Sequence, residues 1–347
     1  MMRKLALGFC FSFSLWVNAQ EGQFSQYFAS SALLNPAMIG TIPNISFNTN
    51  YKIGGRRDQE SYLELVQATF TYPFQRKTSI DHQIGAAGIT FFSERRGPQG
   101  IYSSQKVLLN GSYSIQLSKL VKREIIFGLQ GGAVQHRLDG SQLQWGSQFS
   151  QFIGFDESAV GEDLGSDPVT YPTFNFGVLY YAYDNENAYV RDRSVTLGLS
   201  VDNLNRANIS FADFDDAQKS YLFRGFGSLK YPIGPRWNIF PSGYVLYSQG
   251  STQINTGLYF STLVSSVRTR TAVVMQFGSW YRFGDSIIGL VGFAVEDFRV
   301  GFSVDYNAQS FDVRREIEGN NISTYELSLT YNFRVRTSFR NVSNPIF

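Results

Sequence analysis

The last strand-forming stretch, residues 325–335, constrains the fold more than any other part of the sequence. Every second residue along it is aliphatic or aromatic: Tyr325, Leu327, Leu329, Tyr331, Phe333 and Val335. The residues between them are polar or charged: Glu326, Ser328, Thr330, Asn332 and Arg334. Because side chains point alternately to the two faces of a strand, one face of this stretch is apolar and the other polar. The pattern predicts a sheet between an apolar medium and a polar interior.

The length of this strand further narrows the choice between a membrane barrel and a soluble β-protein. Strands of about 9–11 residues with one apolar face suit a bilayer-spanning β-barrel, whereas strands of soluble proteins most often have about 5–6 residues. Residues 297–308 alternate in the same way, 16% of the chain is aromatic, 32 residues are glycine and only 17% are charged. Aromatic girdles and glycine-induced curvature are typical of such barrels. We therefore predict an all-β protein, a single transmembrane antiparallel β-barrel.

Strand candidates recur along the chain, about fourteen in all. They cover residues 45–52, 61–73, 83–93, 105–117, 124–136, 172–183, 193–203, 220–232, 237–248, 252–262, 271–283, 286–295, 297–308 and 323–335. An even number is expected when both termini lie in the periplasm. The long gaps 137–171, 203–219 and 308–322 then follow odd-numbered strands and are predicted outer loops. In residues 61–73 and 286–295 polar and apolar residues alternate poorly, although both stretches are counted among the fourteen strands.

The N-terminus has the features of a secretory signal peptide. Arg3 and Lys4 precede the apolar run from Leu5 to Val17, and Ala19 completes a small-residue cleavage site. We predict four parts, in chain order a signal peptide, a periplasmic or lumenal pre-barrel segment, the outer-membrane barrel and a C-terminal tail. Their boundaries are residues 1–19, 20–44, 45–335 and 336–347. Within the pre-barrel segment, residues 29–34 are compatible with a short helical turn.

The sequence shows no arrangement typical of catalysis or metal binding. The only histidines, His82 and His136, have no partners at ligand spacing, and the acidic residues of 156–167 match no calcium-loop pattern. The run Gly-Leu-Gln-Gly-Gly at 128–132 opens no helix, so it indicates strand curvature or close packing. We predict no enzyme activity, no cofactor and no metal. The net charge of +2 and the lack of long basic runs also argue against nucleic acid as a partner.

Charged residues on the predicted lumen face leave two interpretations open. These residues are Arg224, Lys230, Arg282, Arg299, Asp305, Glu326 and Arg334. They are expected either to line a conduit or to pair with one another across a filled or water-containing lumen.

Several stretches together carry a family resemblance. The most specific is Gln23-Phe24-Ser25-Gln26-Tyr27 followed by Leu34-Asn35-Pro36-Ala37 and Gly40. Further matches are residues 84–92, 136–143, 172–181, 197–201, 280–285 and 300–306. In this order they resemble the PorP/SprF family of Bacteroidetes outer-membrane proteins, which belong to the type IX secretion system. The chain departs from the family before its last strand, where a Gly-Ser-His-Glu type signature keeps only Glu326.

The resemblance implies a non-enzymatic barrel in the cell outer membrane that works with the secretion machinery. We expect it to help secrete or anchor cargo through the cargo's C-terminal signal domain and to dock periplasmic type IX secretion components. Outer-membrane lipid is a further expected partner, and gliding motility is linked to the family in some species. The candidate partner-binding residues are Gln23, Phe24, Ser25, Gln26, Asn35, Pro36, Arg56, Arg57, Arg137 and Asp139.

Two other interpretations of the sequence remain. One is a passive outer-membrane channel or small-solute transporter, which a steady conductance in planar bilayers would reveal. The other is a soluble secreted β-sandwich adhesin, which salt or carbonate would extract from membranes.

Overall fold

The computed structural model describes residues 22–55, 62–76, 82–118, 122–139, 146–150, 152, 154–156, 167–185, 192–210, 217–265, 273–307 and 323–333. The predicted signal peptide and C-terminal tail lie outside these ranges. Among the residues described, no helix is long and apolar enough to cross a membrane. Two short helices come first, α1 (Ser31–Leu34) and η1 (Pro36–Thr41). The helical turn expected near residues 29–34 is thus confirmed.

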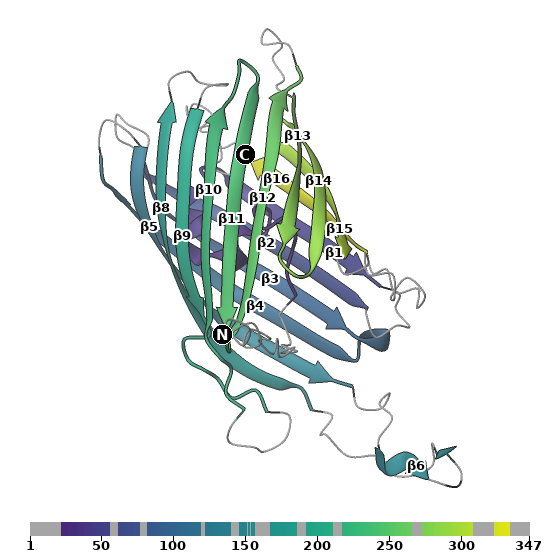
Figure 1. Cartoon of the computed structure of the whole chain (residues 1–347). Coiled ribbons are helices and arrows are strands. Elements are labelled where there is room, and N and C mark those ends of the chain that lie inside the picture. Colours follow the sequence, from purple (N-terminus) through teal and green to yellow (C-terminus); the bar gives the residue numbers. More distant parts are fainter. Residues whose placement is uncertain are drawn as a thin grey trace, which may run out of the picture.

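Fourteen antiparallel strands form one closed barrel (Figure 1). They are β1 (Ile45–Gly54), β2 (Leu63–Arg76), β3 (His82–Arg96), β4 (Tyr102–Gln116), β5 (Lys122–Leu138), β8 (Val169–Asn185), β9 (Asp192–Asp202), β10 (Leu222–Pro232), β11 (Trp237–Ser248), β12 (Ser251–Leu263), β13 (Val273–Arg282), β14 (Ser286–Val295), β15 (Phe298–Asn307) and β16 (Thr324–Phe333). The ring closes where β1 pairs with β16, with Ile45 opposite Phe333 and Gly54 opposite Thr324. The prediction of a single antiparallel all-β barrel of about fourteen strands is confirmed.

The connections distinguish the two ends of the barrel. The three longest ones follow β5, β9 and β15, and we call this side the long-loop end and the other side the short-turn end. The connection after β5 carries a two-stranded hairpin, β6 (Phe149–Ser150) and β7 (Gly154–Phe155), which projects from the barrel wall in Figure 1. The sequence did not predict this hairpin, because strands of two residues are too short to show an alternating pattern. A short 3-10 turn, η2 (Pro98–Gly100), connects β3 and β4 at the same end.

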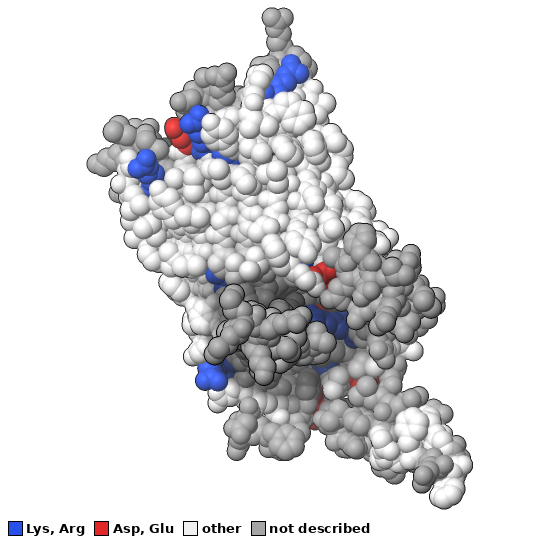
Figure 2. All heavy atoms as spheres, viewed as in Figure 1, with Lys and Arg blue, Asp and Glu red and all other residues white. Residues whose placement is uncertain are grey.

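The outer face of the barrel is a broad apolar band. Leu129 and Leu199 are 65% and 71% exposed, and Figure 2 shows a wide part of the wall without a charged residue. Exposed aromatic side chains stand near both strand ends: Phe47, Trp237, Phe298, Tyr331 and Phe333 near the short-turn end, and Tyr51, Tyr247, Phe283, Tyr306 and Tyr325 near the long-loop end. A band of this size is unfavourable in water and suits hydrocarbon, with the aromatic girdles at the two interfaces.

The strands that alternate poorly in sequence have apolar side chains on both faces. On β14, Ile288 and Leu290 are buried on the lumen side, whereas Ile287 and Phe293 are exposed on the outer side. On β2, Leu65 is fully buried on the lumen side. Because the lumen-facing side chains of these strands are apolar as well, polar and apolar residues do not alternate there in the sequence. These positions mark where packed apolar side chains line the lumen.

Candidate functional site

The N-terminal segment, residues 22–41, lies inside the barrel, and we call it the lumen segment. Nearly all of its side chains from residue 24 onward are buried. At the long-loop end the backbone N–H of Gly22 donates to Glu94 Oε1 at 3.2 Å. Where the segment ends, near the short-turn end, Gln83 Nε2 donates to the carbonyl oxygen of Ile42 at 3.0 Å. The segment therefore runs through the lumen from the long-loop end to the start of β1.

Two buried carboxylates hold the start of the lumen segment. Glu326 of β16 accepts hydrogen bonds from the backbone N–H groups of Ser25 at 2.6 Å and Gln26 at 3.1 Å. Asp305 of β15 accepts from the Ser25 hydroxyl at 2.5 Å and from Lys52 Nζ at 2.8 Å. Hydrogen bonds to charged groups are about twice as strong as those between neutral groups. We call Lys52, Asp305 and Glu326 the carboxylate latch.

Several of the predicted lumen-facing charges have partners inside the barrel. Arg282 lies 2.8 Å from Asp285 and 3.6 Å from Asp305, and so joins the latch. Arg224 forms an ion pair with Asp202, and Lys230 lies 5.7 Å from the ring centroid of Phe240. Arg334 lies outside the described residues. For the pairs named here, the lumen charges face partners rather than an open conduit.

An aromatic cluster packs around the middle of the lumen segment. The Tyr27 ring centroid lies 4.9 Å from that of Trp280 and 5.4 Å from that of Tyr244. Phe28 packs on Tyr259 with a centroid distance of 5.8 Å. Aromatic pairs of this kind contribute about 0.5–1.5 kcal/mol each beyond the burial of their area.

The backbone of the lumen segment comes very close to the barrel wall at two glycines. A Cβ at Gly128 of β5 would overlap backbone atoms of Pro36 and Ala37, and one at Gly177 of β8 would overlap the side chain of Asn35. Only glycine leaves this space free. The close packing predicted for the glycine run at 128–132 is confirmed at Gly128.

Asn35 joins the lumen segment to the barrel wall. Its side-chain oxygen accepts a hydrogen bond from the N–H of Ala37 at 2.8 Å and thereby caps η1. Its side-chain nitrogen donates to the carbonyl oxygens of Leu199 at 3.0 Å and Val178 at 3.2 Å. One fully buried side chain thus satisfies groups on the segment and on two barrel strands.

We expect Asn35→Ala to lower the free energy of unfolding by about 2 kcal/mol, because it removes a helix cap and two buried hydrogen bonds. Asn205→Ala is the matched control. Asn205 is exposed and donates one hydrogen bond, to the carbonyl of Pro172 at 2.7 Å, so its loss should cost less than about 0.5 kcal/mol. Urea unfolding of the two variants in detergent, followed by tryptophan fluorescence, measures the difference. Equal losses would contradict this role of Asn35.

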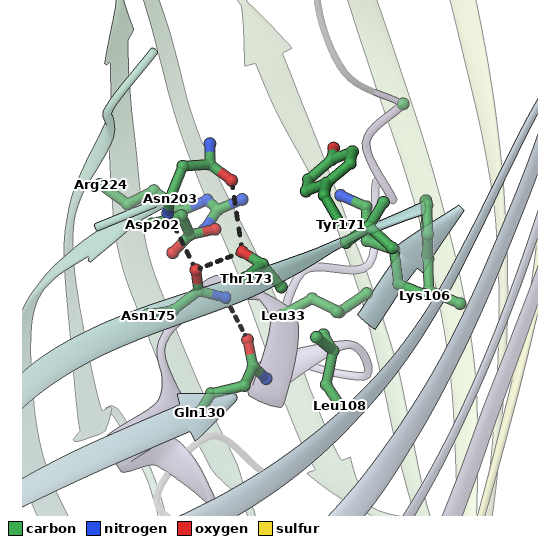
Figure 3. A pocket seen from close by; sticks show the side chains of 13 residues that line it. Leu33, Lys106, Leu108, Gln130, Tyr171, Thr173, Asn175, Asp202, Asn203 and Arg224 are labelled. Carbon is green, nitrogen blue, oxygen red and sulfur yellow. Dashed lines mark hydrogen bonds and ion pairs between the residues drawn. The ribbon is translucent and has the colours of Figure 1, made fainter. Parts of the chain in front are cut away.

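A small polar cavity lies beside the lumen segment, toward the long-loop end (Figure 3). Its volume is about 50 Å³. Leu33 of the segment lines it together with residues of β4, β5, β8, β9 and β10, among them Lys106, Gln130, Thr173 and Arg224. The sequence did not predict this cavity, since its walls come from strands far apart in the chain.

The structure places the predicted partner-binding residues in two regions. Gln23, Phe24, Ser25, Gln26, Asn35 and Pro36 lie in the lumen segment, where they contact the barrel wall; Phe24, for example, packs edge to face on Phe92 at 6.2 Å between ring centroids. Arg137 is exposed near the end of β5, and the N–H of Asp139 just beyond donates to the carbonyl of Ile101 at 2.9 Å. Arg56 and Arg57 lie outside the described residues. Partner binding by all ten remains a prediction.

Sequence reasoning missed several residues of this site. Lys52 occupies a polar-face position of β1 with no distinguishing neighbour, and Trp280 and Tyr244 pack on Tyr27 from strands more than 200 residues away. One feature of the sequence could have indicated packing inside the lumen. Polar and apolar residues do not alternate along β14, because its lumen face is apolar.

The closed ring, the apolar band with aromatic girdles and the polar lumen define an outer-membrane β-barrel protein. The chain matches the family model described as type IX secretion system membrane protein PorP/SprF over residues 17–331. It belongs to this family, and as a barrel-forming membrane protein of a secretion system it resides in the cell outer membrane.

Comparison with other proteins adds only distant similarity. No curated protein matches the chain. Among solved structures, the toluene transporter TbuX of Ralstonia pickettii is 9% identical, with 88% of this chain and 94% of that chain covered and a TM-score of 0.44. A FadL homologue of Pseudomonas aeruginosa is 13% identical, with coverage of 88% and 94% and a TM-score of 0.39. BamA of Haemophilus ducreyi lacking POTRA domains 1-3 is 9% identical, with coverage of 84% and 70% and a TM-score of 0.39.

Proposed function

We propose that this protein is a closed outer-membrane anchor of the type IX secretion system. Its long-loop end faces the cell exterior and holds the C-terminal signal domain of a secreted cargo protein. Its short-turn end faces the periplasm and docks the secretion machinery. The lumen segment carries this proposal, because a barrel with its own chain latched inside by Asp305 and Glu326 suits binding at its two ends better than solute passage.

The hairpin at the long-loop end offers a contact for cargo. Phe152 is 95% exposed, and Phe149 and Phe155 beside it are also exposed, with 5.4 Å between the centroids of the latter two rings. Aromatic side chains exposed to water on a projecting loop are typical of surfaces that bind another protein. This hairpin is our candidate for the cargo contact.

The short-turn end offers a contact for the machinery. Arg123, Arg193 and Arg236 are exposed there, together with Asp184 and Glu296, and Figure 2 shows Lys and Arg beside an acidic group at the upper edge of the apolar band, which is this end. The exposed arginines of this rim can pair with acidic side chains of another protein. We propose that periplasmic components dock at this rim.

Affinity purification of the tagged protein from gently solubilised outer membranes, with mass spectrometry, tests the proposal. We expect to recover a secreted protein and secretion subunits. Replacing Phe149 and Phe152 with serine should lower cargo recovery at least about tenfold, since exposed aromatic anchors often contribute about 2 kcal/mol or more to binding. Val264→Ser, which removes an exposed apolar residue at the other end, is the control and should leave recovery unchanged.

Two results would overturn the proposal. Normal secretion and cargo recovery with the double serine variant would remove the hairpin's role. A steady open-pore conductance of the unmodified protein in planar bilayers would instead support a passive channel or small-solute transporter.

A further inference from the structure

A second cavity, which we call the mouth cavity, lies between the lumen segment and strands β10 and β11. Its volume is about 60 Å³, and residues of the segment line it together with Arg224 of β10 and Tyr244 and Leu246 of β11. Arg224 stands two residues from the start of β10, and Leu246 stands two residues from the end of β11. Both of these strand ends are at the long-loop end of the barrel. The cavity therefore lies just inside the mouth of the lumen at that end.

Most of the wall of the mouth cavity is apolar and held in place by packing. Six side chains form this part of the wall: Phe24, Tyr27, Leu33, Leu34, Tyr244 and Leu246. All of them except Leu33 are buried, and the ring centroids of Tyr27 and Tyr244 are 5.4 Å apart. Water finds few hydrogen-bond partners against such a wall, whereas an aliphatic group gains free energy when it leaves water. The wall favours an aliphatic ligand.

Gln23 adds an acceptor to this apolar wall. Its side-chain Nε2 donates to Gln253 Oε1 at 2.6 Å, which orients the amide. Its Oε1 is buried and accepts no hydrogen bond from any residue that the structure describes. Because a buried acceptor without a donor is costly, a ligand that brings an N–H or O–H group to Gln23 is favoured.

Arg224 adds hydrogen-bond donors without adding a net charge. Its Nη1 pairs with Asp202, so the charge of the guanidinium is offset by that carboxylate. A guanidinium carries five N–H donors in total, and the others can serve an acceptor of the ligand. The mouth cavity is therefore suited to a neutral group that both donates and accepts.

The volume limits the apolar part of the ligand to one side chain. A water molecule needs about 10–15 Å³ of cavity volume, so about 60 Å³ has room for about four or five heavy atoms. A leucine side chain has this size. In a peptide, the leucine is flanked by a backbone N–H and a backbone C=O, the donor and the acceptor that Gln23 and Arg224 call for.

We propose that the mouth cavity binds one leucine-sized aliphatic side chain of an incoming peptide. The backbone N–H of that peptide donates to Gln23 Oε1, and its C=O accepts from Arg224. The site itself rests on the cavity and its lining. That the peptide belongs to the secreted cargo rests on the proposed function, which places cargo at this end of the barrel.

Binding of neutral peptides to the full-length barrel in lipid nanodiscs tests the site. The probe is Gly-Ser-Leu-Ser-Gly with blocked ends and a neutral fluorophore, and the reference peptide has serine in place of leucine. We expect the leucine peptide to bind at least about tenfold more tightly, because its side chain leaves water. A third peptide, methylated at the backbone nitrogen of leucine, cannot donate to Gln23 and should bind about fivefold more weakly than the probe.

Two variants separate the apolar wall from the acceptor. Leu246→Trp fills the cavity and should abolish the preference for leucine. Its matched control is Val245→Trp, next to it on β11 but exposed on the outer face, which should keep the preference. Gln23→Met leaves the cavity open and removes the amide oxygen, so it should still prefer leucine but bind the methylated and unmethylated peptides equally. This variant tests the site even where Leu246→Trp does not fold.

The outcomes separate the site, its ligand and the proposed function. Equal binding of the leucine and serine peptides, or an unchanged preference in Leu246→Trp, would overturn the aliphatic site. A penalty for methylation that persists in Gln23→Met would overturn the role of Gln23. Competition by 3-methylbutanol as strong as that by the unlabelled probe would overturn the peptide as the ligand. Peptide binding together with normal cargo secretion in Leu246→Trp cells would keep the site and remove its part in the proposed function.

Discussion

Gly128→Leu is expected to convert the closed barrel into a conducting pore. A side chain at this position would overlap backbone atoms of Pro36 and Ala37, and backbone overlap cannot be relieved by rotating a side chain. The lumen segment must then leave its place, although the barrel strands keep their own pairing. We expect steady single-channel currents in planar bilayers where the unmodified protein has none, and bacteria that become sensitive to antibiotics too large for ordinary porins.

Gly111→Leu is the matched control for this experiment. Gly111 lies on the neighbouring strand β4, faces outward, and has open space where a Cβ would stand. The control should therefore stay closed. In both backgrounds an added Ala32→Cys reports on the segment, because Ala32 is only 3% exposed: a thiol reagent should label it in Gly128→Leu and not in Gly111→Leu. A Gly128→Leu barrel that stays closed, with Ala32→Cys protected, would disprove the close packing described here.

Lys52→Met is expected to lower the free energy of unfolding by about 3–5 kcal/mol, because breaking a buried ion pair leaves a charge without its partner. Lys52 and Asp305 are both almost fully buried, with 2.8 Å between Nζ and Oδ2. Among the residues that the structure describes, Asp305 would then keep one cation, Arg282, at 3.6 Å. Urea unfolding in detergent, compared with the unmodified protein, gives the loss.

The double variant Lys52→Met, Asp305→Leu separates charge from packing. Replacing both members of a buried pair with apolar residues is often neutral, so we expect it to recover most of the stability lost in Lys52→Met. Together with the single variant Asp305→Leu, these two variants complete a double-mutant cycle, which gives the coupling energy of the pair. A double variant that is less stable than Lys52→Met would show that hydrogen bonds to Ser25, rather than charge balance, stabilise the latch.

The sequence by itself determined the strands and the membrane-facing surface. Alternation such as that of residues 325–335 is a local property, because neighbouring side chains on a strand must point to opposite faces. It therefore predicted the number and order of the barrel strands and the apolar band. Where both faces of a strand are apolar, as on β14, the same criterion became weak. The two-residue strands β6 and β7 are too short to show an alternating pattern.

Only the tertiary structure decided how the lumen is occupied. Lys52 and Asp305 are 253 residues apart, and Ser25 and Glu326 are 301 apart, so no local pattern indicates that they meet. The motif from Gln23 to Gly40 was visible in the sequence, but its place inside the barrel depends on Gly128, Gly177 and the aromatic side chains around Tyr27. These contacts form only when the ring closes and brings distant strands around one space. Strand pattern follows from neighbouring residues, whereas lumen packing depends on the closed barrel as a whole.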